Sequence, residues 1–277
     1  MAKKYDSRPI GIFDSGVGGL TVLKALVSRF PHERFIYLGD TARVPYGTKS
    51  ARTVERYSIQ VADCLLARGV KGLVVACNTA SALGMEALKS HSPTPILGVI
   101  EPGCRAAGAL AAGLGRPGKV GVIGTRSTVA SGAYPAQLSR LDPGIEVFSL
   151  ACPLFVPLVE EGWLEQPAVR LIVEESLSPF LDQRLDALIL GCTHYPLLAP
   201  VIAEVMGSAV PLVDSATAVA DELERYLVRV IAPAPAVPEA TGARLHFLVT
   251  DVADRFKEMA VRFIRDVDEQ MVEVVDL

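Results

Sequence analysis

The chain has 277 residues, of which 50% are hydrophobic and 21% charged, so it can bury a substantial core, and its length predicts about two domains. Its net charge of -4 argues against nucleic acid or an anionic membrane surface as the main partner. The N-terminus (MAKKYDSRPIGIFDSG) has no apolar segment after its lysines, and no stretch of about 18 uncharged apolar residues follows, so we expect a cytoplasmic protein with neither secretory signal nor membrane span.

Short apolar runs alternate along the chain with amphipathic segments such as Thr53–Arg68 and Val169–Leu181. This alternation predicts βαβ units, parallel sheets buried on both faces, and therefore the α/β class. Ligands in such folds bind at the carboxyl ends of strands, so the residues that follow each run are the functional candidates. The predicted strands are Ile10–Phe13, Phe35–Leu38, Leu73–Ala76, Ile96–Val99, Val120–Ile123, Val147–Leu150, Ala187–Leu190 and Val210–Val213.

The segments between and after these strands suggest where domains meet. Glu101–Gly118 is rich in Ala and Gly and is expected to form a helix and turn that carries the chain from one domain into another. Ala232–Ala243 is a Pro/Ala-rich loop. It precedes a predicted strand at Leu245–Thr250 and a predicted helix at Val252–Ile264.

A weak internal repeat organises the chain. IGIFDSGVGGLTVL from Ile10 resembles VGVIGTRSTVASGA from Val120, and LVVACNTASAL from Leu73 resembles LILGCTHYPLL from Leu188. The two similarities occur in the same order at nearly the same offset. They predict two pseudosymmetric α/β halves that face one another, each with a cysteine at a strand end.

Two of the five cysteines are candidate reactive groups. Cys77 follows an apolar run and precedes Asn78 and Thr79, where helix N-terminal amides would favour its thiolate. Alternatively, Cys77 is a small buried hydrophobe and its two polar neighbours cap a helix. Cys192 repeats the arrangement with His194 two residues later, close enough to tune the thiol or share its proton. The other cysteines, Cys64, Cys104 and Cys152, are expected to be free, because no CxxC pair, disulfide framework or zinc cluster is present.

Other strand ends carry polar residues with two interpretations each. Asp14 and Ser15 precede a Gly-rich turn that is neither a dinucleotide fingerprint nor a P-loop. The turn within Gly39–Gly47 presents backbone N–H groups to a carboxylate, or is an ordinary turn. Thr125 and Thr128 either cap helices or donate hydroxyl hydrogen bonds to a substrate. The ordinary interpretation of Glu160 and its neighbour Glu161 is the solvated end of a helix.

A pair of equivalent thiols suits a symmetric reaction. A hydrolase has no role for a second equivalent thiol, and a thiol–disulfide enzyme needs adjacent cysteines. Moving a proton from one face of a carbon to the other requires one residue as base and another as acid, with the roles exchanged in reverse. Because neither a pyridoxal lysine nor a metal cluster can be identified, the residues predict a cofactor-independent reaction.

At these residues the chain resembles the glutamate racemase family of the aspartate/glutamate racemase superfamily, from about residue 9 to residue 265. The motifs that carry the resemblance are FDSGVGG (Phe13–Gly19), GDTARVPYG (Gly39–Gly47), VACNTASA (Val75–Ala82), GVIEP (Gly98–Pro102), LFVPLVEEG (Leu154–Gly162) and GCTHYP (Gly191–Pro196). One departure is Val249-Thr250-Asp251, where the family often has Ser/Thr-Gly-Asp, which affects the local turn only.

The resemblance implies a first domain of residues 1–100 and 214–277, a second of residues 101–213, and an active site between them. Cys77 would exchange the proton of D-glutamate with assistance from Asp14. Cys192 would exchange that of L-glutamate with assistance from His194. Glu160 would lie near this second thiol as a further catalytic residue, a choice over Glu161 that the sequence leaves open. The implied substrate-binding residues are Asp14, Ser15, Pro45, Tyr46, Gly47, Asn78, Thr79, Thr125, Thr128, Cys192, Thr193 and His194.

The family also implies that D-glutamate is made for peptidoglycan synthesis by a homodimer, with no cofactor or metal. Because no long N-terminal extension is present, we expect activity without a cell-wall precursor as activator. Two alternatives stay open: an aspartate racemase that uses the same thiols, and an amino-acid-binding regulatory protein that has lost its chemistry.

Overall fold

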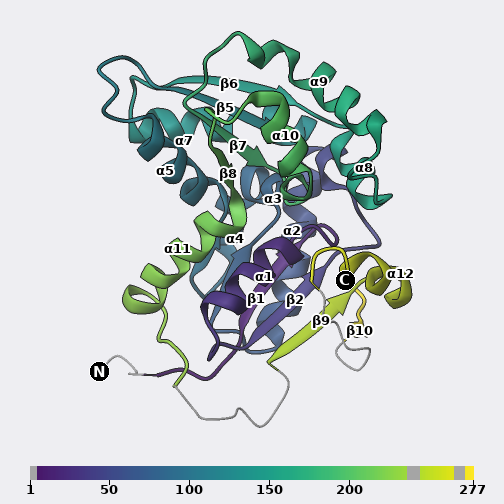
Figure 1. Ribbon diagram of the computed structural model, residues 1–277. Coiled ribbons are helices and arrows are strands. Elements are labelled where there is room, and N and C mark those ends of the chain that lie inside the picture. Colours follow the sequence, from purple (N-terminus) through teal and green to yellow (C-terminus); the bar gives the residue numbers. More distant parts are fainter. Residues whose placement is uncertain (1–4, 236–243, 265–271) are drawn as a thin grey trace.

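The computed structural model describes residues 5–235, 244–264 and 272–277, and consists of two parallel sheets with helices around them (Figure 1). The six-stranded sheet has the order β10-β9-β2-β1-β3-β4, and the four-stranded sheet has the order β6-β5-β7-β8. Every paired strand in both sheets is parallel, as the alternation of apolar runs and helices predicts. The predicted α/β class is confirmed.

The strands lie close to the apolar runs of the sequence. They are β1 (Ile10–Asp14), β2 (Phe35–Gly39), β3 (Gly72–Val75), β4 (Ile96–Gly98), β5 (Lys119–Gly124), β6 (Glu146–Ala151), β7 (Ala187–Gly191), β8 (Leu212–Asp214), β9 (Leu245–Val249) and β10 (Val272–Val274). The predicted strand at Val210–Val213 begins instead at Leu212, because Pro211 has no N–H to donate to a ladder. The short strand β10 was not predicted.

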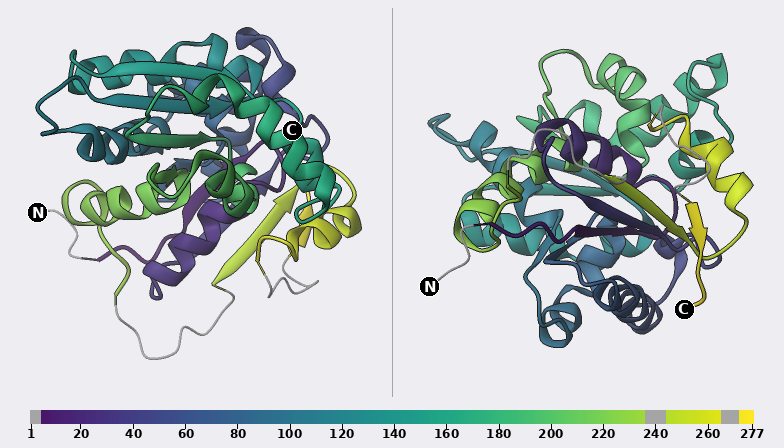
Figure 2. Two further views of the ribbon diagram at one scale, coloured as in Figure 1. Left: turned by 45° about the horizontal axis from the view of Figure 1, so that its top comes forward. Right: turned by 90° about the horizontal axis from the view of Figure 1, so that it is seen from below.

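Helices cover both faces of the first sheet, with α1 on one side and α2 on the other (Figure 2). The helices are α1 (Leu20–Arg29), α2 (Ala51–Ala67), α3 (Asn78–Leu83), α4 (Met85–His91), α5 (Ile100–Ala111), α6 (Arg126–Ala130), α7 (Ala133–Leu141), α8 (Phe155–Glu160), α9 (Pro167–Leu181), α10 (Ala199–Met206), α11 (Ser215–Arg229) and α12 (Ala253–Ala260), with 3-10 turns η1 (Tyr46–Thr48) and η2 (Tyr195–Leu198). None of the described helices is long and apolar enough to cross a membrane.

Two helices carry the chain between the sheets. Helix α5 follows β4 of the first sheet and leads to β5 of the second, and α11 follows β8 and leads back. The two helices pack against each other, and Arg105 of α5 pairs with Glu222 of α11 at 2.6 Å. The predicted turn within Glu101–Gly118 begins at Ala112, and Gly113 takes a left-handed φ of 72° there. The strands that make up each sheet are compatible with the two predicted domains, one of residues 1–100 and 214–277 and the other of residues 101–213. This division into domains stays a prediction.

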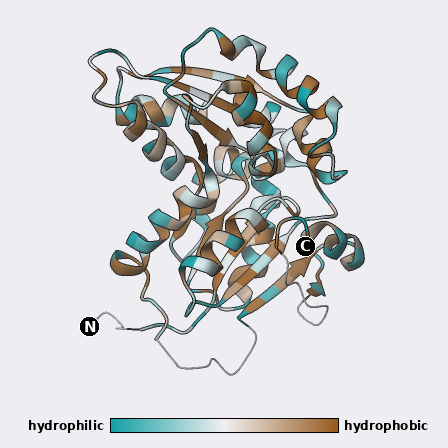
Figure 3. Cartoon of the chain, viewed as in Figure 1, coloured by the Kyte–Doolittle hydropathy of each residue, from teal (hydrophilic) through white to brown (hydrophobic). Residues whose placement is uncertain are grey.

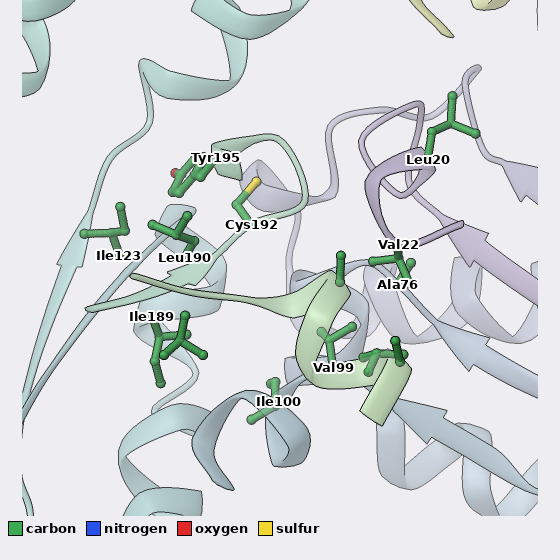
Figure 4. Packing of buried hydrophobic residues seen from close by; sticks show 14 of the residues in the cluster. Leu20, Val22, Ala76, Val99, Ile100, Ile123, Ile189, Leu190, Cys192 and Tyr195 are labelled. Carbon is green, nitrogen blue, oxygen red and sulfur yellow. The ribbon is translucent and has the colours of Figure 1, made fainter. Parts of the chain in front are cut away.

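The hydrophobic core consists of two clusters, one of which spans both halves. One cluster of buried side chains includes Ile123, Ile189 and Leu190 of the second sheet together with Val22 and Val99 of the first half (Figure 4). Apolar residues line the strands, and polar residues gather on the outer helices (Figure 3). The two halves therefore pack against each other as one body. The ends of the central strands of one half face those of the other.

Parts of the predicted segments differ or fall outside this description. The helix predicted at Val252–Ile264 is the shorter α12, which ends at Ala260. Residues 236–243, most of the Pro/Ala-rich loop, and residues 1–4 lie outside the described residues.

Candidate active site

Two cysteines follow equivalent strands of the two sheets. Cys77 lies just after β3, which pairs with the central strand β1, and Cys192 just after β7, which pairs with the central strand β5. Both side chains are almost entirely buried, with exposed fractions of 5% and 6%. They line one small cavity of about 20 Å³. Its lining residues are Ser15, Val44, Pro45, Tyr46, Gly47, Cys77, Asn78, Thr79, Thr125, Val156, Cys192, Thr193 and His194.

Cys77 occupies the N-cap position of α3. Its sulfur accepts a hydrogen bond from the Ala80 N–H at 3.4 Å and donates one to Ser15 Oγ at 3.7 Å. Burial and the nearby Asp14 carboxylate raise the pKa of the Cys77 thiol to about 12, against the opposing effect of these hydrogen bonds. Cys77 is therefore held as a protonated thiol at neutral pH.

Asp14 ends β1 directly behind the cavity and is fully buried. Its carboxylate accepts hydrogen bonds from the Gly16 N–H at 3.0 Å and from Thr193 Oγ1, across the interface, at 3.3 Å. Burial raises the pKa of Asp14, although the charge of His194 works against the shift. A carboxyl group in this position can hold a proton more readily than an exposed one.

Cys192 lies next to a histidine that is itself oriented by a carboxylate. His194 Nδ1 lies 3.9 Å from Cys192 Sγ, and Nε2 lies 3.1 Å from Glu160 Oε1 at the end of α8. Burial acts to lower the pKa of His194, but its hydrogen bonds with Cys192 and Glu160 outweigh it and raise the pKa to about 10. The positive charge of a protonated His194 therefore lies beside the Cys192 sulfur.

Between the two glutamates that the sequence leaves open, the contact favours Glu160. Glu160 reaches His194, whereas Glu161 is the exposed residue that follows α8. Arg262, from the segment after α12, donates to the carbonyl oxygens of Val159 and Glu160 and so holds the end of α8.

Three threonine hydroxyls from both halves form a closed triangle. Thr79 Oγ1 lies 3.1 Å from Thr125 Oγ1 and 3.0 Å from Thr128 Oγ1, and the last two are 2.9 Å apart. Thr79 is the second residue of α3, while Thr125 caps α6 by accepting from the Thr128 N–H at 3.3 Å. These hydroxyls can turn toward an anionic ligand without any movement of the backbone.

The turn at η1 lines the cavity with Pro45, Tyr46 and Gly47. The Tyr46 hydroxyl donates to Asp40 Oδ2, and Thr250 Oγ1 donates to Asp40 Oδ1 at 2.9 Å. Arg43 completes this cluster at 2.7 Å from Asp40 Oδ2. Tyr46 is thus fixed by a buried polar network, and Thr250, which lies at the position of the missing family glycine, is part of it.

The sequence predictions and the cavity agree at most positions. Of the candidate residues, all line the cavity except Asp14, Thr128 and Glu160, which contact residues that do. Val44 and Val156 also line the cavity and were missed, because an apolar residue beside a turn or on a short helix gives no functional signal. Within the described ranges, no group of three or more His, Cys, Asp or Glu residues could hold a metal ion.

Comparisons with known proteins show which family the chain is similar to. The Asp/Glu/Hydantoin racemase family model matches residues 13–223. A glutamate racemase from Geobacter metallireducens is 48% identical over 258 residues, which is 93% of each chain. Two crystal structures each match at 37% identity over 98% of both chains. They are a glutamate racemase isoform from Bacillus anthracis (TM-score 0.90) and a glutamate racemase from Francisella tularensis in complex with D-glutamate (TM-score 0.85).

Proposed function

This chain belongs to the Asp/Glu/Hydantoin racemase family, and from that premise we propose that it is a cofactor-independent glutamate racemase that interconverts L- and D-glutamate. The observation that carries the proposal is the pair of buried thiols, Cys77 and Cys192, that enter one cavity from equivalent strand ends. The D-glutamate would supply peptidoglycan synthesis. The homodimer and the cytoplasmic location stay predictions.

The two half-sites differ in a way that suits the conversion of L- to D-glutamate. Cys192, acting as the base beside the protonated His194, takes the α-proton and leaves the electron pair of the C–H bond on the α-carbon and its carboxylate. Cys77, held as a thiol by its raised pKa, gives its proton to the other face of the same carbon. The reverse reaction exchanges the roles, and Asp14 and His194 accept or return protons between turnovers.

The small cavity supports a site that closes around its substrate. A volume of about 20 Å³ leaves room for little more than one water molecule, which needs roughly 10–15 Å³. Glutamate can therefore enter only if the two halves separate, and their closure then excludes water from the carbanion-like transition state. The threonine triangle, the Asn78 amide and the backbone of Gly47 supply the donors for two carboxylates.

An aspartate racemase is the nearest alternative, since the same thiols would act on a substrate one carbon shorter. The high identity to glutamate racemases over nearly the whole chain favours glutamate. A regulatory protein that only binds an amino acid would need neither thiol, and both are present in the cavity.

The test follows racemisation and α-proton exchange together. The purified protein is incubated with each glutamate enantiomer in deuterium oxide without cofactor, beside Cys77→Ser, Cys192→Ser and the control Cys64→Ser, which lies outside the cavity on α2. We expect racemisation with deuterium at the α-carbon, lost in the first two variants and kept in the third. If only aspartate reacts, the substrate assignment is wrong, and if glutamate binds unchanged without reacting, the regulatory alternative replaces the enzyme.

A further inference from the structure

The side-chain amide of Asn78, the residue after Cys77, has hydrogen bonds to its oxygen but, within the described part of the chain, none from its nitrogen. The residue begins α3, lines the cavity and is only 2% exposed. Its amide oxygen accepts from Tyr134 Oη at 2.6 Å and from Ser215 Oγ at 3.2 Å. Its amide nitrogen has no hydrogen-bond partner among the described residues. A buried donor without an acceptor is costly, which points to a partner that arrives with the substrate.

The two hydroxyls decide which end of the amide is free. An amide group can be turned over without changing its shape, and its orientation follows from the hydrogen bonds around it. Burial raises the pKa of Tyr134, so its phenol keeps the proton that it donates to Asn78 Oδ1. With the oxygen held by two donors, the NH₂ group is the part of Asn78 left to serve a ligand in the cavity.

The three residues come from three parts of the fold. Asn78 follows β3 of the first sheet, Tyr134 lies on α7 beside the second sheet, and Ser215 is the first residue of α11, which returns the chain from one sheet to the other. In Figure 1, α3 lies between the two halves and close to the start of α11. Ser215 falls in the same predicted domain as Asn78, so Tyr134 is the donor that reaches the amide only while the two halves are together.

We propose that Tyr134 and Ser215 are positioning residues that hold the Asn78 amide with its NH₂ group toward the cavity, where it binds a carboxylate of the substrate. The proposal rests on the racemase function and extends it, because neither hydroxyl lines the cavity and both act through Asn78. It makes substrate affinity depend on closure: separation of the halves removes the Tyr134 donor and leaves the amide oxygen with Ser215 alone, so the amide is held less firmly.

A double-mutant cycle distinguishes positioning from a general structural role. Tyr134→Phe removes one hydrogen bond and should raise KM for both enantiomers by about fivefold to tenfold, with little change in kcat. Asn78→Ala should raise KM further, and the double variant Asn78→Ala/Tyr134→Phe should match Asn78→Ala alone, because the phenol then has no amide to orient. Ser215→Ala should show the same pattern with a smaller effect.

Tyr226→Phe is the matched control. It removes the partly buried Tyr226 hydroxyl on α11, which donates to Ile96 O at 3.3 Å and does not contact Asn78. The kinetics of this variant should equal those of the unchanged protein. An unchanged KM in Tyr134→Phe, or the same increase with and without Asn78, overturns the proposal. If the unchanged protein neither turns over nor binds glutamate in calorimetry, the proposed function fails first and this inference fails with it.

Discussion

Gly47 touches Thr125 where the two halves of the molecule meet. A Cβ atom on Gly47 would lie 2.5 Å from Thr125 Cβ and 2.6 Å from its Cγ2, closer than carbon atoms can approach. Beside this contact, Ser127 Oγ donates to the Gly47 carbonyl oxygen at 2.9 Å. Glycine at this position therefore permits the full closure of the cavity.

Gly47→Ala should impair substrate binding more than stability. The added methyl group forces Thr125 or the η1 turn to move, so we expect KM to rise at least about tenfold with a small change in melting temperature. Gly108→Ala on α5 is the control, since its Cβ would meet only Ile145 Cδ1 at an ordinary 3.7 Å. It should keep normal kinetics and gain about 0.5–1 kcal/mol in free energy of unfolding. An unchanged KM in Gly47→Ala would show that closure tolerates the methyl group.

Glu160→Gln should slow turnover in both directions. The neutral amide no longer stabilises the protonated His194, so the positive charge beside Cys192 is more easily lost, and we expect kcat to fall by about tenfold. The alkaline limb of the pH–rate profile should also move to lower pH, because the pKa of His194 falls. Glu161→Gln, one residue later and exposed, should behave as the unchanged protein. Equal losses of kcat in the two variants would contradict the role of Glu160 in orienting His194.

Cys77 should make the fold less stable at alkaline pH. The pKa of its thiol rises from 9.0 to about 12 on folding, so the folded state holds the proton more tightly than the unfolded chain does. Its contribution to stability is complete below pH 9 and is lost as pH rises toward 12, by at most about 4 kcal/mol. Denaturant unfolding at several pH values should give a steeper alkaline decline for the unchanged protein than for Cys77→Ala. Parallel declines would contradict this assignment.

Lys71 should contribute to stability rather than to catalysis. Its buried ammonium group pairs with Glu33 at 2.7 Å and donates to the carbonyl oxygens of Asp6 and Ala232, which join the segments before β1 and after α11. Lys71→Met leaves Glu33 as an unpaired buried charge and should cost about 3–5 kcal/mol in free energy of unfolding, with normal kinetics below the transition. Arg170→Met, which breaks only exposed ion pairs, should change stability little. A similar small change in Lys71→Met would show that the buried pair is not needed.

The strands and the two thiols were readable from the sequence for a simple physical reason. Parallel strands buried on both faces are continuous apolar runs, so their ends could be located. Cys77 stands two residues after β3, and Cys192 directly follows β7. Strand β10 (Val272–Val274) has the charged Glu273 at its centre, so it does not form an apolar run. Val210 was wrongly included in the predicted strand Val210–Val213, because its apolar side chain was given more weight than the proline that follows it.

The supporting residues of the site could not be predicted in the same way. Tyr134 and Ser215 lie far from Asn78 in sequence, and only the packing of α7 and α11 against α3 brings their hydroxyls to its amide. Tyr46 was predicted from its turn, but the engagement of its hydroxyl by Asp40 depends on tertiary contacts. Local patterns identify side chains that end strands, whereas the second layer of a site is a property of the assembled fold.

The placement of one thiol after β3 and the other after β7 carries a thermodynamic constraint on the proposed racemase. Enantiomers have equal free energies in water, so their interconversion has an equilibrium constant of one and kcat/KM must be the same in both directions. The unlike surroundings of Cys77 and Cys192 can change how far each enantiomer saturates the enzyme, but not which enantiomer accumulates. A substitution in either half-site must reduce both directional efficiencies by the same factor, and a net supply of D-glutamate depends on the reactions that consume it.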